Sequence, residues 1–145
     1  MSDLQTIPRE PRYDLVKTPT PLQCLSGFER KLGRPCLYMK RDDLMEIGLG
    51  GNKLRSLEFW LGAALRERAD IVLVAGGATS NLCRLTAAAA TMAGLDCVII
   101  HNAEDSPANR ERSFLNRLFG AETRFIGPVG EDERGAAMTV AAEEL

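Results

Sequence analysis

A lysine that directly follows a glycine turn is the residue of this sequence best placed for chemistry. Lys53 ends the run Gly50-Gly51-Asn52, and an amphipathic segment begins at Leu54. Glycines let the backbone adopt positive φ and approach a bound group closely, and Asn52 suits the N-cap of the following helix. Lys53 is therefore predicted in the first helical turn, where the positive end of the helix dipole disfavours an ammonium. Such an amine is a candidate for reaction with a bound group, but most lysines are simply solvated surface residues.

A second candidate segment, residues 75–81, follows a wholly apolar run. Two glycines permit a tight turn there, and Thr79, Ser80 and Asn81 then supply hydroxyl and amide groups. The unpaired backbone N–H groups at the start of the next helix would lie beside these side chains, which together form a suitable seat for a carboxylate or a phosphate. The alternative is that Ser80 or Asn81 only caps the helix.

Short β-rich runs alternate with helical periods after residue 35. Strands are predicted at four places, residues 35–40, 71–75, 96–100 and 122–126. Helices are predicted over residues 52–68, 80–93, 107–119 and from about 134 onward, with apolar stripes that include Leu54, Leu57, Leu61, Phe114, Leu115 and Leu118. This order predicts an α/β fold whose parallel twisted sheet has βαβ crossovers and helices on both faces. Ligands bind such sheets beyond the carboxyl ends of the strands, where the two candidate loops are expected.

Composition narrows the class of protein. The 145 residues suffice for a sizeable core, and a net charge of −2 without a basic stripe argues against a nucleic-acid partner. No apolar signal core or membrane-spanning run is visible, so a cytoplasmic protein without membrane contact is predicted. The four cysteines, at positions 24, 36, 83 and 97, fit neither a metal pattern nor a redox pair, and free buried thiols are predicted.

Two further groups of polar residues are predicted to be structural. The cluster Arg41-Asp42-Asp43 has no histidine or additional carboxylate placed to help it hold a metal, so local ion pairing is preferred and no metal site is predicted. His101 ends a predicted strand, and a lone histidine there is more often satisfied by its neighbours than catalytic.

Several of these runs, taken together, resemble the N-terminal part of a family of pyridoxal-phosphate enzymes. That family includes 1-aminocyclopropane-1-carboxylate deaminase and D-cysteine desulfhydrase, within the tryptophan synthase beta-like superfamily. The resemblance is carried in order and in spacing by residues 40–44 (KRDDL), 50–59 (GGNKLRSLEF) and 77–84 (GATSNLCR), and is extended by residues 18–22 and 117–122.

The resemblance implies roles for individual residues. Lys53 would form the Schiff base with pyridoxal 5'-phosphate and later carry a proton, and Asn81 would hydrogen-bond the ring hydroxyl of the cofactor. Asn52 would mainly shape the lysine turn. Ser80, with the N–H groups of Asn81 and Leu82, would hold the substrate carboxylate. The cofactor would serve as the electron sink in deamination or α,β-elimination on a small amino acid.

The sequence departs from the family pattern near both loops. Ser56 occupies a place where members carry a second lysine that can reach the cofactor phosphate. Thr79 precedes Ser80-Asn81 where glutamine is usual, and Leu82 follows where a polar residue is usual. These changes predict a substrate that differs from those of the best-known members, with a smaller or more apolar group near Leu82.

Length is the largest departure. Family members are about twice as long, and their second half supplies the phosphate-binding cup. By resemblance, residues 1–50 belong to an incomplete large domain and residues 51–145 to a small open α/β domain. We expect the chain to be a fragment, or the first of two pieces, that needs a C-terminal complement and forms a homo-oligomer when complete. Turnover by the 145-residue chain alone would contradict this expectation.

Two other functions remain open at the level of sequence. The first is a nucleotide-binding α/β domain that uses Gly76-Gly77 as a phosphate turn, but residues 75–81 fit neither the G-x-G-x-x-G nor the Walker pattern. The second is a catalytically degenerate or truncated domain that binds a partner or a small amino acid without turnover.

Overall fold

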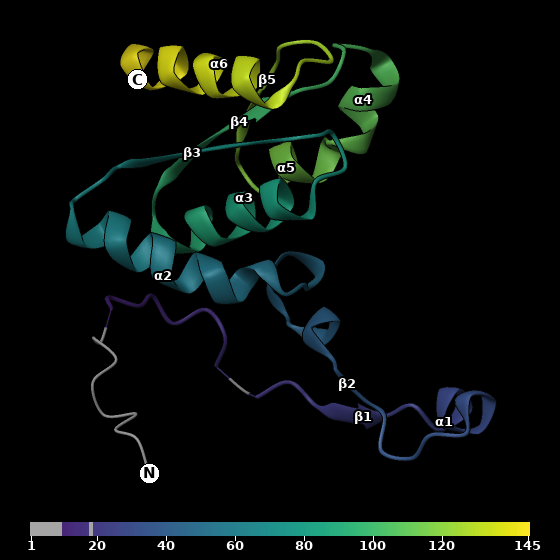
Figure 1. Ribbon diagram of the computed structural model, residues 1–145. Helices are drawn as coiled ribbons and strands as arrows, with labels where there is room; N and C mark the ends of the chain where they lie inside the picture. The colour runs from purple at the N-terminus through teal and green to yellow at the C-terminus, as the bar shows by residue number, and fades with distance from the viewer. Residues whose placement is uncertain (1–9, 18) are drawn as a thin grey trace.

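A parallel three-stranded sheet with helices on both faces forms the body of the computed structural model, which describes residues 10–17 and 19–145 (Figure 1). The predicted α/β class is confirmed. The first elements are β1 (Leu22–Cys24), α1 (Ser26–Leu32) and β2 (Tyr38–Lys40), followed by two 3₁₀ turns, Asp42–Leu44 and Ile47–Leu49. The body contains α2 (Lys53–Arg66), β3 (Ile71–Gly76), α3 (Asn81–Ala93), β4 (Asp96–His101), α4 (Pro107–Arg112), α5 (Phe114–Leu118), β5 (Glu122–Phe125) and α6 (Glu131–Glu144).

The order of the strands is β3-β4-β5, and both pairs are parallel. Gly76 lies opposite His101, which lies opposite Phe125, so the three strands end at the same edge of the sheet. The loop that leads from β3 into α3 begins at this edge, as predicted. In the described part of the chain β3 is paired on one side only.

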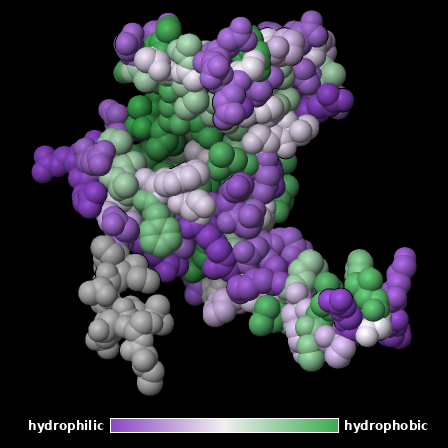
Figure 2. All heavy atoms as spheres, viewed as in Figure 1, coloured by the Kyte–Doolittle hydropathy of each residue, from purple (hydrophilic) through white to green (hydrophobic). Residues whose placement is uncertain are grey.

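Alternate residues of the strands serve two cores, as the period of a pleated strand requires. Val72, Val74 and Ile99 face α2 and α3, whose buried residues include Leu54, Leu57, Leu61 and Leu85. The opposite face of the sheet packs on α6 through Ile71, Leu73, Ala75, Val98, Ile100 and Ala141. Figure 2 shows hydrophobic side chains exposed in the hollow between α6 and α2. Residues of β3 and of α2, among them Trp60, line a cavity of about 370 Å³.

The N-terminal segment packs on α2 before the chain turns away. The backbone N–H of Tyr13 donates to the carbonyl of Glu58 at 2.8 Å, and Leu15 is buried in the core beside α2. β1, α1 and β2 then extend from the body (Figure 1), with β1 and β2 paired antiparallel as a separate two-stranded sheet. The strand predicted at residues 35–40 is shorter than expected, because Cys36 adopts a left-handed φ of 63° that interrupts the extended backbone.

The helix predicted over residues 107–119 is broken into α4 and α5 at Ser113. In a continuous helix the carbonyl of Arg110 would accept from the N–H of Phe114. Here the Ser113 hydroxyl donates to it at 3.3 Å and the Arg117 guanidinium at 3.1 Å. The predicted burial of Phe114 and Leu118 is wrong, since they are 52% and 62% exposed.

The last helix begins at Glu131 rather than near Arg134. Its first turn carries three acidic residues, which the positive end of the helix dipole favours, and the Glu133 carboxylate accepts from the N–H of Gly130 at 3.2 Å. None of the helices in the described residues is both long enough and apolar enough to cross a membrane.

The prediction of four buried thiols holds for only two of the cysteines. Cys83 and Cys97 are buried, whereas Cys24 and Cys36 are exposed on the segment that extends from the body. Burial raises the pKa of the Cys83 thiol and raises the pKa of Cys97 to about 12.

Candidate active site

The lysine turn depends on two glycines with positive φ. Gly50 has φ 75° and Gly51 φ 138°, backbone conformations that other residues rarely adopt. A Cβ at Gly50 would lie 2.2 Å from the carbonyl oxygen of Asp43, and a Cβ at Gly51 would lie 2.6 Å from Nδ2 of Asn81. The turn therefore requires glycine twice, once to fit the preceding loop and once to let Asn81 approach.

Lys53 is the first residue of α2, as predicted, and its side chain is exposed. Asn52 occupies the N-cap position, but its side chain makes no capping hydrogen bond, which corrects the expected role as a cap. The reason is its backbone, which is already helical with φ −61° and ψ −19°, whereas a side-chain cap needs an extended conformation.

The first turn of α3 presents polar groups beyond the end of β3. Ser80 is the N-cap, and its hydroxyl oxygen accepts from the N–H of Cys83 at 3.3 Å. No described residue accepts from the N–H of Asn81 or Leu82, so both donors are available to an anion. Asn81 and Leu82 are half-buried, and Thr79 is exposed.

Arg84 joins the two candidate loops. Its Nη2 atom donates to the carbonyl of Gly50 at 3.3 Å and also to Oδ1 of Asn81. Its other terminal nitrogen, Nη1, is buried without an acceptor among the described residues. The lysine turn and the start of α3 are thus in contact at Gly51 and Asn81 and are bridged by one guanidinium.

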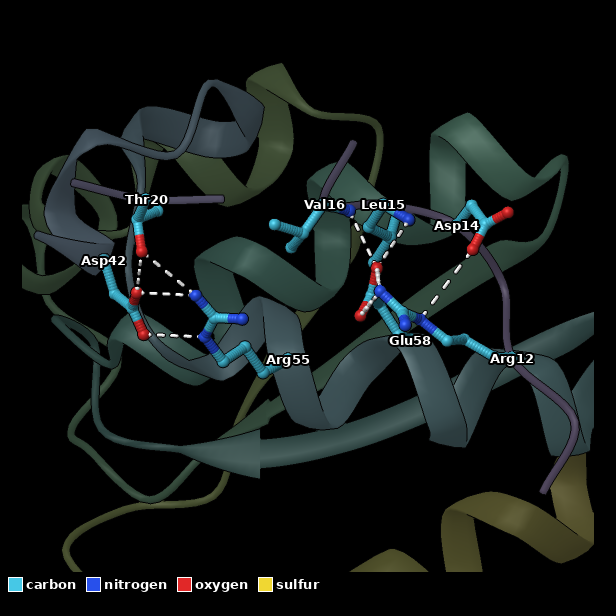
Figure 3. A network of polar contacts seen from close by, with 8 residues as sticks. All are labelled: Arg12, Asp14, Leu15, Val16, Thr20, Asp42, Arg55 and Glu58. Atoms are coloured by element: carbon cyan, nitrogen blue, oxygen red, sulfur yellow. Dashed lines mark hydrogen bonds and ion pairs between the residues drawn. The ribbon is translucent and has the colours of Figure 1, made fainter. Parts of the chain in front are cut away.

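Asp42 holds the lysine turn from the other side, and Figure 3 shows its carboxylate with Arg55 and Thr20. Its carbonyl oxygen accepts from the N–H of Gly51 at 3.0 Å, and its carboxylate accepts two hydrogen bonds from Arg55, each of 2.8 Å. Thr20 donates a further hydrogen bond to the carboxylate at 2.6 Å, and Lys40 donates to the Thr20 hydroxyl at 2.7 Å. The hydrogen bonds from Arg55 and then from Thr20 hold the pKa of Asp42 well below its usual range. Arg41 pairs with Asp43 at 2.7 Å, so the expected local ion pairing is confirmed, and Asp42 extends it to α2.

A second carboxylate on α2 fixes the N-terminal segment. Glu58 is 2% exposed, and its carboxylate accepts from the N–H groups of Leu15 at 3.1 Å and Val16 at 2.8 Å. Arg12 completes this cluster with an ion pair of 2.8 Å (Figure 3). Arg55 and Glu58 therefore attach two separate segments of the first fifty residues to the helix that begins with Lys53.

His101 is satisfied by its neighbours, as expected. It is fully buried at the end of β4, with Nδ1 3.0 Å from the carbonyl oxygen of Gly76 and Nε2 3.2 Å from Nδ2 of Asn116. Because a carbonyl only accepts, Nδ1 carries the proton and Nε2 accepts from Asn116. His101 thus links the end of β4 to the end of β3 and to α5.

Comparison with known proteins shows the family to which a chain with these loops belongs. Residues 13–145 match the family described as pyridoxal-phosphate dependent enzyme. The chain belongs to this family. It is 45% identical over 116 residues to the D-cysteine desulfhydrases of Klebsiella pneumoniae subsp. pneumoniae and Salmonella paratyphi B, an alignment that spans 79% of this chain and 35% of each relative. The chain thus covers about a third of the length of these relatives.

A solved structure agrees in fold. The crystal structure of an ACC deaminase homologue has a TM-score of 0.84 and 35% identity, over 94% of this chain and 41% of that one. The resemblance seen in the sequence is therefore confirmed, and it extends beyond the motifs that carried it. Thr18, one of those motif residues, lies outside the described residues.

The residues present fit part of a pyridoxal-phosphate site. They offer an exposed amine on Lys53, an amide on Asn81 and two free N–H groups at the start of α3. Glycines also keep the backbone free of side chains here. A Cβ at Gly76 would lie 2.8 Å from Oγ of Ser80, and a Cβ at Gly51 would lie 2.6 Å from Nδ2 of Asn81. Nη1 of Arg84, which is buried and has no acceptor among the described residues, is a further donor at the same junction.

The bridge made by Arg84 was missed at the level of sequence, although a signal for it existed. Arg84 follows Asn81 by three residues, the spacing at which helical side chains meet. The contact between Asp42 and Arg55 gave no such signal, because it joins a loop to a helix through tertiary packing.

Proposed function

We propose that this chain supplies the lysine-bearing part of a pyridoxal-phosphate-dependent enzyme that deaminates a small amino acid or carries out α,β-elimination on it. The observation that carries the proposal is the contact between the lysine turn and the start of α3, at Gly51 and Asn81, in a chain of this family. The names of its relatives, D-cysteine desulfhydrase and ACC deaminase homologue, agree with this reaction class.

The chain's own groups suit distinct tasks in such a reaction. When bound, pyridoxal phosphate supplies an aldehyde that reacts with amines and a ring that accepts the electrons of a broken bond. The Lys53 amine would hold the aldehyde and then move a proton at the substrate α-carbon. The Asn81 amide would bind the ring hydroxyl. The hydroxyl of Ser80 would donate to the substrate carboxylate beside the N–H groups of Asn81 and Leu82.

The residues around the proposed carboxylate site favour a substrate that differs from D-cysteine and 1-aminocyclopropane-1-carboxylate, with a smaller or more apolar group near Leu82. Leu82 is half-buried at the start of α3, and Thr79 leaves a short side chain before Ser80. Neither residue presents an amide or an imidazole to a polar substrate group. A preference for D-cysteine or 1-aminocyclopropane-1-carboxylate over other amino acids, measured in a complete enzyme, would contradict this part of the proposal.

Turnover would also need groups from outside these 145 residues. Ser56, in the first turns of α2, offers no cation to a phosphate, and the chain spans 35% of its desulfhydrase relatives. We therefore include in the proposal a complementing segment that completes the phosphate site, either in the same polypeptide or as a partner.

A labelling experiment tests the role of Lys53. The chain is incubated with pyridoxal phosphate, reduced with borohydride and digested, and peptides carrying a phosphopyridoxyl group are located by mass spectrometry. We expect the label at Lys53 and its loss in Lys53→Ala. Lys31→Ala is the matched control, because Lys31 is an exposed lysine on α1, and labelling of Lys53 is expected to be unchanged.

Equal labelling of Lys53 and Lys31 would count against the proposal. It would favour instead a domain that keeps the fold without the chemistry, which the residues at positions 56, 79 and 82 also suit. Binding of a small amino acid without any phosphopyridoxyl label would support that second function.

A further inference from the structure

The side-chain amide of Asn81 lies between the Arg84 guanidinium and the lysine turn. On one side is the Arg84 guanidinium, which donates from Nη2 to Oδ1 of Asn81. On the other is the lysine turn, where a Cβ at Gly51 would lie 2.6 Å from Nδ2 and 3.2 Å from Oδ1. The amide therefore has its oxygen toward Arg84 and its nitrogen toward the turn.

This orientation is fixed by chemistry. An arginine side chain has only hydrogen-bond donors, so it can bind the amide oxygen but not the amide N–H groups. If the amide were flipped, Nδ2 would face the guanidinium and both groups would lose a hydrogen bond. Arg84 thus selects one of the two rotamers that differ by exchange of O and N.

Arg84 is itself held in place. The same Nη2 atom that binds Asn81 donates to the carbonyl of Gly50 at 3.3 Å, so the guanidinium is attached to the lysine turn as well as to its own helix. Among the described residues none accepts a hydrogen bond from Nδ2 of Asn81, which leaves that donor free for a ligand beside the turn.

We propose that Arg84 is a positioning residue that presents Asn81 to the cofactor as a hydrogen-bond donor. The inference rests on the proposed function, in which Asn81 binds the ring hydroxyl of pyridoxal phosphate. A donor at that point binds the hydroxyl oxygen best when the oxygen is ionised, whereas an amide oxygen would require it to keep its proton. Arg84 therefore favours the ionised ring oxygen without touching it.

The orientation is tested first without cofactor. In the NMR spectrum of the full chain we expect cross-peaks between the Asn81 NH₂ protons and the α-protons of Gly51, and their loss in Arg84→Met. Arg84→Lys keeps a cationic donor and is expected to retain them. Arg112→Met is the matched control, because Arg112 donates to Oδ1 of Asn109 at 3.3 Å with the same spacing on the exposed helix α4.

The second measurement compares two ligands. We expect Arg84→Met to weaken the binding of pyridoxal phosphate about tenfold, the value of one lost hydrogen bond to a charged group. Binding of 3-deoxypyridoxal phosphate, which lacks the ring hydroxyl, should change little. A general loss of structure would weaken both ligands alike.

Absence of the cross-peaks in the wild-type chain would overturn the inference, as would their persistence in Arg84→Met. An equal loss of affinity for both ligands would do the same. Since the cross-peaks are read without cofactor, they test Arg84 even where Lys53 takes up no label, a result that would count only against the proposed function.

Discussion

At the scale of single residues, Asp42 is notable because it contacts the lysine turn on both sides of Lys53. Its main chain binds Gly51, two residues before the lysine, and its carboxylate binds Arg55, two residues after it. The bonds from Arg55 and Thr20 favour the ionised carboxylate, and its pKa is lowered accordingly. One residue thereby ties the lysine turn to α2, through a main-chain carbonyl and an ionised carboxylate.

We predict that Asp42→Asn removes part of the acid sensitivity of the fold. A carboxylate whose pKa is lowered by folding contributes its full stability above its unfolded pKa, about 3.9, and loses it as the pH falls toward the lower folded value. At pH 7 the substitution should cost about 1 kcal/mol, because Arg55 is 41% exposed and water screens the pair. Urea unfolding measured from pH 7 to pH 2 checks both effects.

Asp43→Asn is the control for that series. Asp43 pairs with Arg41 at 2.7 Å, but its side chain is 60% exposed and makes no contact with α2. Its hydrogen bonds from Arg41 lower the pKa of Asp43, but water screens this exposed pair, so Asp43→Asn should change the free energy of unfolding and its acid dependence much less than Asp42→Asn does. The same loss of stability with falling pH in the wild type and in Asp42→Asn would contradict the prediction.

At the scale of elements, the sequence predicted what depends on local periodicity. The apolar stripe of α2 lies where it was expected, and α3 has its predicted bounds to within one residue. The break between α4 and α5 was not predictable in this way. It arises because the Ser113 and Arg117 side chains take the carbonyl of Arg110, a competition that hydrophobic spacing does not reveal.

The same break turns the polar side of α5 inward, and this gives a prediction that opposes the hydrophobic pattern. Asn116 is 3% exposed and supplies the hydrogen bond to Nε2 of His101. Asn116→Leu leaves that nitrogen buried without a donor and should cost about 1–3 kcal/mol. Leu118→Asn, on the exposed face of the same helix, should cost far less. Denaturant unfolding measures the free energy of unfolding of both variants. A larger loss in Leu118→Asn than in Asn116→Leu would show that α5 packs through its apolar face.

At the scale of the whole molecule, the first fifty residues are attached to the body at two points that sequence could not identify. Arg55 and Glu58 are three residues apart and lie on the same face of α2. The partners of Glu58 lie 42 to 46 residues away along the chain, and those of Arg55 lie 13 and 35 residues away. Leu15 and Met45 also join the core beside α2. Our proposal of a boundary near residue 50 therefore describes two parts that share packing.

Adding one methyl group to α2 at Gly62 tests the close contact between this helix and the N-terminal segment. A Cβ at Gly62, within α2, would lie 2.4 Å from the carbonyl oxygen of Pro11. Gly62→Ala should therefore displace residues 10–17 and increase their rate of proteolytic cleavage severalfold, as followed by mass spectrometry. Gly135→Ala in α6 is the control, because its Cβ would meet nothing within 4 Å and should stabilise that helix by about 1 kcal/mol. Unchanged cleavage in Gly62→Ala would contradict the contact.

The edge of β3 that pairs with no described strand has a consequence for the purified chain in solution. Its six residues, Ile71–Gly76, are apolar on both faces and half-buried, and one edge of the strand pairs with no other strand of the described residues. Residues 71–74 also line the cavity beside Trp60. Such an edge is a template for adding another strand from any molecule that meets it. Colloidal stability of the purified polypeptide will consequently fall with concentration faster than its modest charge of −2 would suggest.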